Sequence, residues 1–354
     1  MKKGRFISPL VHMLVFVGMP LSAAHMQAQS LIRDNGQMQF KSTLQAGNYS
    51  GIAHVESNVY ALADDKAPHD GFRYVTIDID SVTGKIKHVQ NVRQVDATAT
   101  NRDAEGVVYI PSSQTLMVVG EADSRIVEYT RNGEATGKEL LLPKGNGNAG
   151  YESLAYDDVN HLLWTCTEGP LPDDLNKSFS KIDTAYAGAF IRIQAYDTNM
   201  KAVGVWPYMT DQPMASRENA RNYAFGVSEL LTVGDSTLLV LEREFYVPHS
   251  MIGSWVQNKI YKVKLQHLLC KLSDKQGTTN GNNAEMLAER PVAKELLYSW
   301  RTHLTLLGRS LANYEGMCLG PQLQDGSQVI ILVADSQNQA YGALRDWFRT
   351  LVVR

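Results

Sequence analysis

Residues 313–336 read NYEGMCLGPQLQDGSQVIILVADS, and this stretch decides the fold. Glu315 and Gly316 precede an apolar run, a turn follows at Gln324–Gly326, and a second apolar run ends on Asp335. Runs rich in Val, Ile and Leu on both sides of an Asp- and Gly-containing turn are typical of a β-hairpin. The stretch is therefore predicted to form two antiparallel strands whose ends carry acids.

The same order of residues occurs again upstream. Each copy has a polar or small residue, an apolar run, a turn, and a second run that ends on acids. The copies are SGIAHVESNVYALADD from Ser50, AEGVVYIPSSQTLMVVGEAD from Ala104, YESLAYDDVNHLLWTCTEG from Tyr151 and GVSELLTVGDSTLLVLERE from Gly226.

Further strand-like runs follow these hairpins, and convincing amphipathic helices are nearly absent. A unit of four antiparallel strands that recurs along a chain is the blade of a β-propeller. We therefore predict an all-β propeller of five blades. Six blades are the alternative if an irregular one lies within 169–224 or 245–312, and a β-sandwich is the competing architecture.

The last unit has too few strands to complete a blade. After Asp335 the only strand-like run is about Trp347–Val353. A strand from the N-terminal region, for which Gln37–Leu44 is the candidate, would complete this blade and leave no free sheet edge around the ring. We expect one domain over residues 29–354.

The N-terminal residues resemble an export signal. A basic start with Lys2, Lys3 and Arg5 precedes an apolar stretch from Leu10 to Leu21 and small-residue cleavage sites. These features predict a secretory signal peptide over residues 1–28 and export to the periplasm or beyond the cell.

The bulk composition narrows the partners. A net charge of -3 with acids and bases interspersed argues against nucleic acid. No second long apolar run calls for membrane insertion. We expect a monomer that acts on a small molecule. The three cysteines, Cys166, Cys270 and Cys318, cannot all pair, and we expect buried free thiols rather than catalytic ones.

The acids of the repeats are predicted to gather at one rim of the channel. Glu105, Glu152 and Glu315 begin the first strand of their hairpins, and Glu229 is displaced by two or three residues in the fourth repeat. Because the second strand of an antiparallel hairpin ends beside the start of the first, carboxylate pairs are expected: Glu105 with Glu121, Glu152 with Glu168, and Glu315 with Asp335.

Converging carboxylates repel one another unless a cation, a basic side chain or water compensates them. Ca²⁺ is the expected compensator, because it takes oxygen ligands in irregular geometry. The seven acids named above are the candidate metal ligands. The alternative is that each acid only caps loop amides, a device that a repeat would copy into every blade.

The segment LVLEREF places Arg243 between Glu242 and Glu244. Strand alternation puts the arginine on one face and the two acids on the other. Arg243 would either grip a phosphate or carboxylate of a substrate or neutralise neighbouring glutamates. Glu242 and His54 are the candidates for taking a proton, although a lone strand histidine is more often structural.

These segments resemble the phytase-like propeller family, described by its esterase-like activity. The resemblance rests on DAEGVVYIP with VVGEAD, GYESLAYD with TCTEGPL, FGVSELL with LVLEREF, and NYEGMCLGPQLQDG with LVADS, and covers roughly residues 45–350. It implies a secreted propeller that hydrolyses esters or phosphoesters. Calcium-dependent phytase and lactonase-type propellers are similar in placing acids and Ca²⁺ on the channel axis.

Two functions follow as expectations. The first is a Ca²⁺-assisted hydrolase working at the acidic rim, with Arg243 holding the substrate anion. The second is a non-enzymatic propeller that binds a glycan, peptide or protein through its long insertions at 170–224 and 246–295. The chain has no dense Lys/Arg patch of the kind that would suit a highly charged inositol phosphate.

Overall fold

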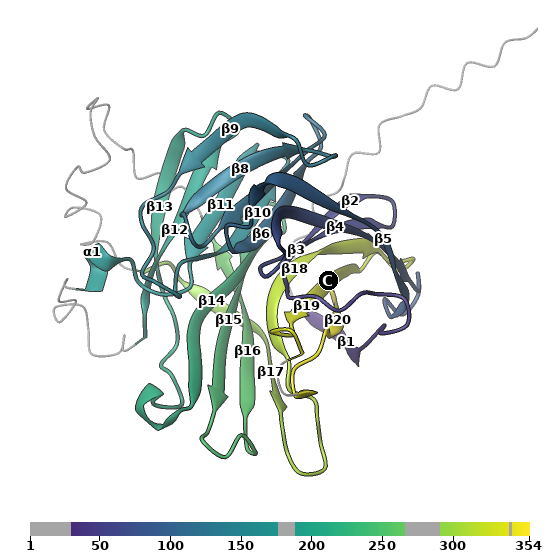
Figure 1. The fold of residues 1–354 in the computed structure, drawn as a ribbon, viewed down its shortest axis with the longest axis vertical. Helices are drawn as coiled ribbons and strands as arrows, with labels where there is room; N and C mark the ends of the chain where they lie inside the picture. The colour runs from purple at the N-terminus through teal and green to yellow at the C-terminus, as the bar shows by residue number, and fades with distance from the viewer. Residues whose placement is uncertain (1–29, 176–187, 266–290, 340–341) are drawn as a thin grey trace, which may run out of the picture.

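The computed structural model describes residues 30–175, 188–265, 291–339 and 342–354. The predicted signal peptide 1–28 and Cys270 lie outside these residues. Five four-stranded antiparallel sheets are arranged as the blades of a propeller, so the predicted fold is confirmed with five blades in the described residues (Figure 1). The only helical elements described are the short α1 (Pro172–Leu175) and a 3-10 turn, Arg217–Asn219.

Each of the first four blades uses four strands that are consecutive in the sequence. Blade 1 is β2 (Tyr49–Glu56), β3 (Val59–Asp64), β4 (His69–Ile79) and β5 (Ile86–Thr100). Blade 2 is β6 (Ala104–Ile110), β7 (Thr115–Gly120), β8 (Arg125–Thr130) and β9 (Ala135–Leu141). Blade 3 is β10 (Tyr151–Asp157), β11 (Leu162–Thr167), β12 (Phe190–Asp197) and β13 (Ala202–Met209). Blade 4 is β14 (Asn222–Thr232), β15 (Thr237–Val247), β16 (Trp255–Lys264) and β17 (Lys294–His303).

Blade 5 is closed by the N-terminal strand, as predicted. Its order is β18 (Asn313–Gln322), β19 (Gln328–Asp335), β20 (Phe348–Val353) and β1 (Leu31–Met38). The closing strand is not Gln37–Leu44, because the chain turns after Met38: the Thr43 and Leu44 amides both donate to the Phe40 carbonyl. The Leu44 side chain is buried in the core instead.

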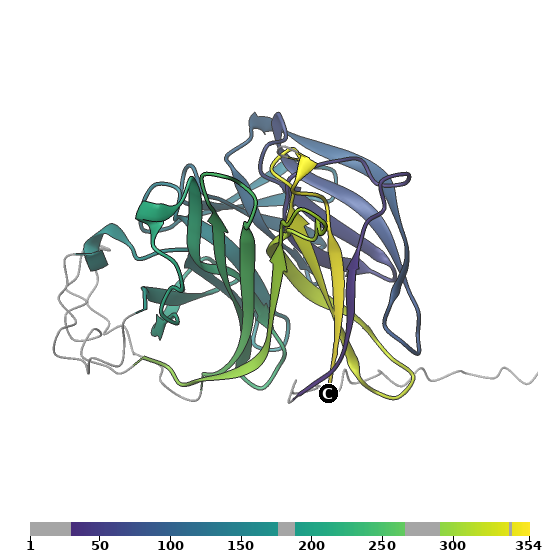
Figure 2. The same cartoon turned by 90° about the horizontal axis from the view of Figure 1, so that it is seen from below.

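The first strands of the blades, β2, β6, β10, β14 and β18, contact one another in a ring around the axis (Figures 1 and 2). Apolar side chains fill the spaces between neighbouring blades. One such core joins Tyr60 and Leu62 of blade 1 to Val333 and Phe348 of blade 5. Burial of these side chains supplies the main driving force for stacking one blade on the next.

Every first strand carries a β-bulge at the same place. The pairing of each first strand with the second strand of its blade skips one residue, and the skipped residues are Ser50, Glu105, Glu152, Ser228 and Glu315. A bulge re-aims one side chain and bends its strand. The propeller thus turns the same side chain of each blade out of the ladder.

The glycine that follows the bulge residue has a steric cause. A Cβ on Gly106 would lie 2.8 Å from the backbone nitrogen of Leu154 in the next blade, and one on Gly51 would lie 2.5 Å from the carbonyl oxygen of Glu105. Neighbouring first strands approach this closely only where a side chain is missing. The glycines that follow the bulge residues therefore mark the contact between blades.

Candidate metal-binding rim at the channel

Two sets of equivalent positions form one rim of the channel. The first set is the five bulge residues, three of which are glutamates: Glu105, Glu152 and Glu315. The second set lies on the second strand of each blade or directly after it, one residue past the partner of the residue that precedes the bulge: Asp65, Glu121, Glu168, Arg243 and Asp335. The rim therefore combines seven carboxylates with a single arginine among these ten positions.

The fourth blade departs from the pattern in both sets. Its bulge residue is Ser228, and Arg243 stands where the other blades have an acid. Glu242 and Glu244 consequently point away from the rim, as strand alternation requires. The second of the two roles expected for Arg243, neutralising the neighbouring glutamates, is the one that the geometry supports.

Arg243 holds one side of the rim together. Its guanidinium pairs with Glu168, lies 2.6 Å from Glu315 Oε1 and 3.9 Å from Glu152 Oε2, and donates to Asn313 Oδ1 at 2.7 Å. The arginine is 4 % exposed and Glu168 is 3 % exposed. An arginine that is buried and committed to three acids is not available to grip a substrate anion.

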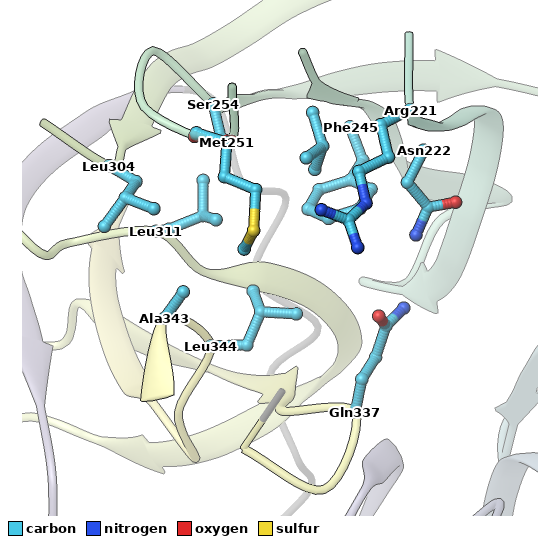
Figure 3. Close-up of a pocket in the computed structure, with 11 residues that line it drawn as sticks. Arg221, Asn222, Phe245, Met251, Ser254, Leu304, Leu311, Gln337, Ala343 and Leu344 are labelled. Carbon is cyan, nitrogen blue, oxygen red and sulfur yellow. The ribbon is translucent and has the colours of Figure 1, made fainter. Parts of the chain in front are cut away.

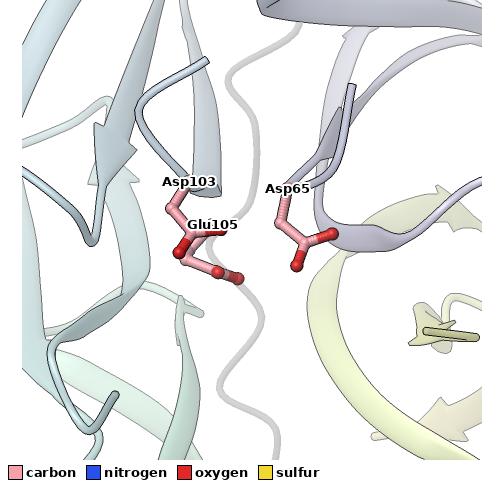
Figure 4. A group of neighbouring side chains, drawn as sticks. All are labelled: Asp65, Asp103 and Glu105. Carbon is pink, nitrogen blue, oxygen red and sulfur yellow. The ribbon is translucent and has the colours of Figure 1, made fainter. Parts of the chain in front are cut away.

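On the other side of the rim, basic side chains neutralise less of the negative charge. Carboxylate oxygens of Asp65, Asp103 and Glu105 lie within 4.8 Å of one another (Figure 4). The half-exposed Lys66 reaches Asp65 at 2.6 Å and Asp103 at 2.7 Å. Glu105 is buried, and its carboxylate makes no hydrogen bond or ion pair within the described part of the chain.

Further carboxylate oxygens at the rim are unsatisfied. Within the described ranges, Asp65 Oδ1 and Glu152 Oε2 are buried without a hydrogen-bond partner. Each such oxygen has lost its hydrogen bonds to water on folding and has gained none from the protein, which costs free energy.

The crowding also appears in the titration of the acids. Burial, followed by the carboxylates of Glu152 and Glu315, raises the pKa of Glu105 well above its ordinary value. Burial also raises the pKa of Asp335 to about 7 and that of Asp65 to about 6, with a smaller contribution from Asp65 and Asp103 respectively. Burial is the main cause of these shifts, and repulsion between the carboxylates, which Arg243 and Lys66 offset only in part, adds to it.

The predicted pairs are brought to one rim, with differences between members. Repulsion by the Glu168 carboxylate helps to raise the pKa of Glu152, and repulsion by Asp335 helps to raise that of Glu315. Glu121 likewise helps to raise the pKa of Glu105. The Oε1 atom of Glu121 also accepts the Gly150 amide at 2.8 Å, so this residue caps a loop as well. Both expectations for the acids, a charged rim and local capping, therefore describe some members.

Glu229 lies in the position of the small residue that follows each bulge, not in the rim. Its Oε1 accepts the amides of Leu154 at 3.2 Å and Leu230 at 2.9 Å, and the Met317 amide also bonds to the carboxylate. The side chain thereby ties three first strands together inside the channel. Its geometry fits a structural brace better than a metal ligand.

The structure brings neither His54 nor Glu242 to the rim. His54 lies four residues beyond the bulge of its strand, is exposed, and contacts the Ser57 carbonyl at 2.9 Å. It lines a cavity at the opposite end of the channel. Glu242 is buried against Lys294 at 2.6 Å and accepts from the Tyr208 hydroxyl at 2.6 Å.

The sequence patterns did not single out Asp65, Asp103 or Lys66 as site residues. Asp65 ends the second strand of its hairpin like Glu121 and Glu168, so the repeat itself could have identified it. Asp103 precedes the repeat, and its backbone lies in the left-handed region with a φ of 62°. No pattern in the sequence predicts this conformation. Cys166 and Cys318 are free and buried, as predicted, and burial raises the pKa of Cys166 to about 12.

The model of the phytase-like family, described as "Esterase-like activity of phytase", matches residues 45–337. The chain belongs to this phytase-like family. The match spans all five bulges and the whole acidic rim. The family resemblance that the repeats suggested is thereby confirmed.

Comparison with solved structures gives distant overlays. A streptogramin B lyase shares 11% identity with a TM-score of 0.36, covering 90% of this chain and 97% of that one. A DUF4221 family member from Bacteroides vulgatus shares 10% identity with a TM-score of 0.42, covering 92% and 98%. Overlays this distant carry no functional argument. No curated protein matches the chain.

Among the residues that the structure describes, no helix combines the length and hydropathy that crossing a membrane requires.

Proposed function

We propose that this phytase-like propeller is an exported hydrolase that cleaves ester bonds at the acidic rim with the help of a divalent cation, for which Ca²⁺ is the best fit. The observation that carries the proposal is Glu105, a buried carboxylate without a partner in the described residues, grouped with Asp65 and Asp103. A buried and unpaired charge is costly unless a cation shares its site.

The residues present fit such an ion. The donors are carboxylate oxygens, which hard divalent cations prefer to nitrogen or sulfur. Asp65, Asp103 and Glu105 would hold the ion, and the unsatisfied Oε2 of Glu152 offers a further oxygen. Glu168 and Glu315 are already paired with Arg243, so they would shape the site without binding the ion.

A bound divalent cation would supply Lewis-acid polarisation of the substrate oxygen. Lys66, which is half exposed and lies 2.7 Å from Asp103, would help to hold the developing negative charge. Asp335 makes no ion pair in the described part of the chain, and burial raises its pKa to about 7, so it is the expected acceptor of the proton from the attacking water.

The charge balance favours carboxylic esters over phosphoesters. Arg243, the single arginine at the ten repeated rim positions, is committed to Glu168 and Glu315 and is almost fully buried. A phosphate dianion would therefore meet Lys66 as its cationic partner beside a surplus of carboxylates. A neutral ester avoids this repulsion.

The test is hydrolysis of 4-nitrophenyl butyrate and 4-nitrophenyl phosphate by the purified full chain, with Ca²⁺ and after exhaustive chelation. We expect ester hydrolysis that chelation abolishes and that Glu105→Gln lowers at least tenfold. The same variant should weaken Ca²⁺-induced thermal stabilisation by at least tenfold in apparent affinity. Butyrate hydrolysis that survives both chelation and Glu105→Gln would rule the proposal out.

The control variant is Glu128→Gln. Glu128 is also a buried glutamate, but it lies on β8 away from the channel and is held by the Thr115 and Thr136 hydroxyls at 2.9 and 2.7 Å. We expect this substitution to leave Ca²⁺ binding and hydrolysis unchanged within twofold. Equal losses in both variants would indicate a general effect of removing a buried charge.

The second candidate function is a propeller that binds a partner without catalysis. Exposed apolar side chains on two of the insertions favour it, Met214 at 49% and Ile252 at 51%. Inactivity towards every ester with Ca²⁺ present, in a folded and Ca²⁺-stabilised protein, would favour this candidate over the hydrolase.

A further inference from the structure

A second feature lies between blades 4 and 5 on the face that carries the acids. It is a cavity of about 190 Å³. Seven apolar side chains form most of its wall: Phe245, Val247, Met251, Leu304, Leu311, Ala343 and Leu344. All of these except Met251 and Leu304 are buried. The wall is therefore a preformed apolar surface that continues a core cluster.

The strand register places this cavity next to the rim. Arg243 and Phe245 lie two residues apart on β15, so their side chains leave the same face of the strand about 7 Å apart. Arg243 meets Asn313 and Glu315 of blade 5, and Phe245 packs in one cluster with Leu311 and Leu344 of the same blade.

A second connection runs through the end of β19. The Gln337 amide donates to Asp335 Oδ1 at 2.7 Å, and the Gln337 side chain lines the cavity. The residue that contacts the acid thus also forms part of the cavity wall. Rim and cavity are consecutive parts of one surface.

The cavity has an apolar and a polar side. Figure 3 places Met251, Leu304, Leu311, Ala343 and Leu344 along one side and Arg221, Asn222 and Gln337 along the other. Binding sites for small molecules commonly combine an apolar lining with a few polar groups that fix orientation. An occupant would therefore carry a compact apolar part and a polar group at one end.

The apolar surface extends outward from the cavity. Ile252 follows Met251 and is 51% exposed, while Leu306 and Leu307 follow Leu304 and are 81% and 101% exposed. The Gly253 amide donates to the Leu304 carbonyl at 2.9 Å, so these two loops lie side by side. An apolar group approaching from solvent would meet apolar side chains first.

The volume limits the size of the occupant. An apolar cavity of about 150 Å³ accommodates one benzene molecule. The 190 Å³ here suits a phenyl ring or a branched or straight chain of about four to six carbons. A long fatty acyl chain or a glycan would not fit.

We infer that this cavity is the acyl pocket of the hydrolase, and that the substrates are esters of small aromatic or short-chain carboxylic acids. The acyl group enters between Phe245, Leu311 and Leu344, and the ester bond then reaches the rim near Asp335. Water adds its oxygen to the ester carbonyl carbon, the carbon–oxygen bond to the alcohol breaks, and the alcohol leaves with a proton. This inference rests on the proposed ester hydrolysis.

The test compares 4-nitrophenyl esters of acetate, butyrate, benzoate and decanoate on the Ca²⁺-loaded full chain. We expect kcat/KM to rise about fourfold per added methylene up to the size of the pocket and to fall for decanoate. Ala343→Leu, which fills the cavity, should lower kcat/KM for butyrate and benzoate at least tenfold and that for acetate less than twofold. Met251→Ala, which enlarges it, should shift the optimum to longer acyl groups.

The control is Leu319→Phe, which narrows the cavity at the opposite end of the channel. It should leave the acyl preference unchanged. An acyl preference that neither Ala343→Leu nor Met251→Ala alters would overturn the inference while ester hydrolysis itself stood. So would a preference that Leu319→Phe alters instead.

A binding measurement separates the pocket from the reaction. Saturation-transfer NMR with benzoate, on chelated protein, reports occupancy without hydrolysis. We expect transfer to the benzoate ring in the wild type and its loss in Ala343→Leu. That result in a protein inactive on all four esters would refute the hydrolase but keep the pocket, whereas equal transfer in both proteins would refute the pocket.

Discussion

Arg243 of blade 4 and Glu315 of blade 5 lie 72 residues apart in the sequence, yet their side chains meet at 2.6 Å inside the channel. Arg243 occupies the position that is an acid in each of the other four blades. The same guanidinium pairs with Glu168 of blade 3. One residue thus neutralises acids from the blades on both sides of its own.

Replacing Arg243 should destabilise the fold before it affects substrate binding. Arg243→Met leaves the buried Glu168 and Glu315 without their cation, and we expect a loss of about 3–5 kcal/mol in the free energy of unfolding. Arg243→Lys keeps a charge but lacks the guanidinium fork, of which one nitrogen reaches Glu315 and the other Glu168, so its loss should be smaller. Urea denaturation followed by tryptophan fluorescence measures both.

Arg125→Lys is the matched control, because Arg125 forms an exposed pair with Glu139 at 3.0 Å. This control should cost less than about 1 kcal/mol. A folded and equally stable Arg243→Lys protein with a raised KM would instead assign the arginine to the substrate.

Stability should fall as pH rises when no divalent cation is present. The pKa of Asp335 is raised to about 7 and that of Asp65 to about 6, both from 3.8. Between about pH 4 and pH 7 the folded protein therefore binds more protons than the unfolded chain, so its free energy of unfolding decreases as pH rises. Thermal unfolding in chelator at pH 5 and pH 8 should give a lower midpoint at pH 8.

Ca²⁺ should reverse this trend, because it binds the deprotonated acids. We expect the midpoint gain on adding Ca²⁺ to be larger at pH 8 than at pH 5. Asp335→Asn should flatten the pH dependence measured in chelator. A midpoint that is higher at pH 8 than at pH 5 in chelator would contradict the prediction.

Gly106→Ala should strain the contact between blades 2 and 3. The added Cβ would lie 2.8 Å from the backbone nitrogen and the Cβ of Leu154, neither of which can move without its strand. We expect a loss of about 2–3 kcal/mol, as for an overpacked core. Equilibrium urea unfolding is the measurement.

Gly308→Ala serves as the control for Gly106→Ala. Its Cβ would meet the Thr305 hydroxyl at 3.0 Å, and this loop side chain, which accepts the Gly308 amide at 2.8 Å, can shift without moving a strand. We expect a change below about 0.5 kcal/mol. Equal losses of unfolding free energy in the two variants would mean that contact between blades does not explain the glycine at position 106.

Removing β1 should weaken blade 5. Five residue pairs join β1 to β20, and cross-strand pairs contribute roughly 0.2–1 kcal/mol each, so a chain starting at residue 39 should lose roughly 1–5 kcal/mol. It also loses the Asp34–Arg349 ion pair. Exposure of the β20 edge should promote association, which size-exclusion chromatography of chains starting at residues 29 and 39 would detect. Equal elution and stability would refute a closing role for β1.

Much of the fold could be predicted because each repeat can be recognised from patterns of neighbouring residues. Apolar runs, turns such as Gln324–Gly326 and the acid-glycine pairs gave the hairpins, the blade count and the closure by an N-terminal strand. The closing strand itself was misplaced by six residues at each end, because Leu31–Met38 is only partly buried and its pairing partner is far away in sequence. Long-range pairing is not encoded in a local run.

The site was predicted in outline. The repeats identified Glu105, Glu152, Glu168, Glu315 and Asp335, since one equivalent position per blade must converge on the axis. His54 and Glu242 were chosen by residue type, and the structure places both elsewhere. Asp103 and Lys66 could not be found, because neither occupies a repeated position.

The sequence by itself determined the propeller, the repetition of acids along it and the places of the glycines where blades touch, because each of these recurs in a short local run of residues. Only the tertiary structure decided which acids are neutralised. Arg243 reaches Glu168 and Glu315 across two blade boundaries, whereas Glu105 is left without a partner in the described residues. Charge compensation in a low-dielectric channel depends on distances between blades, and those distances exist only once the ring has closed.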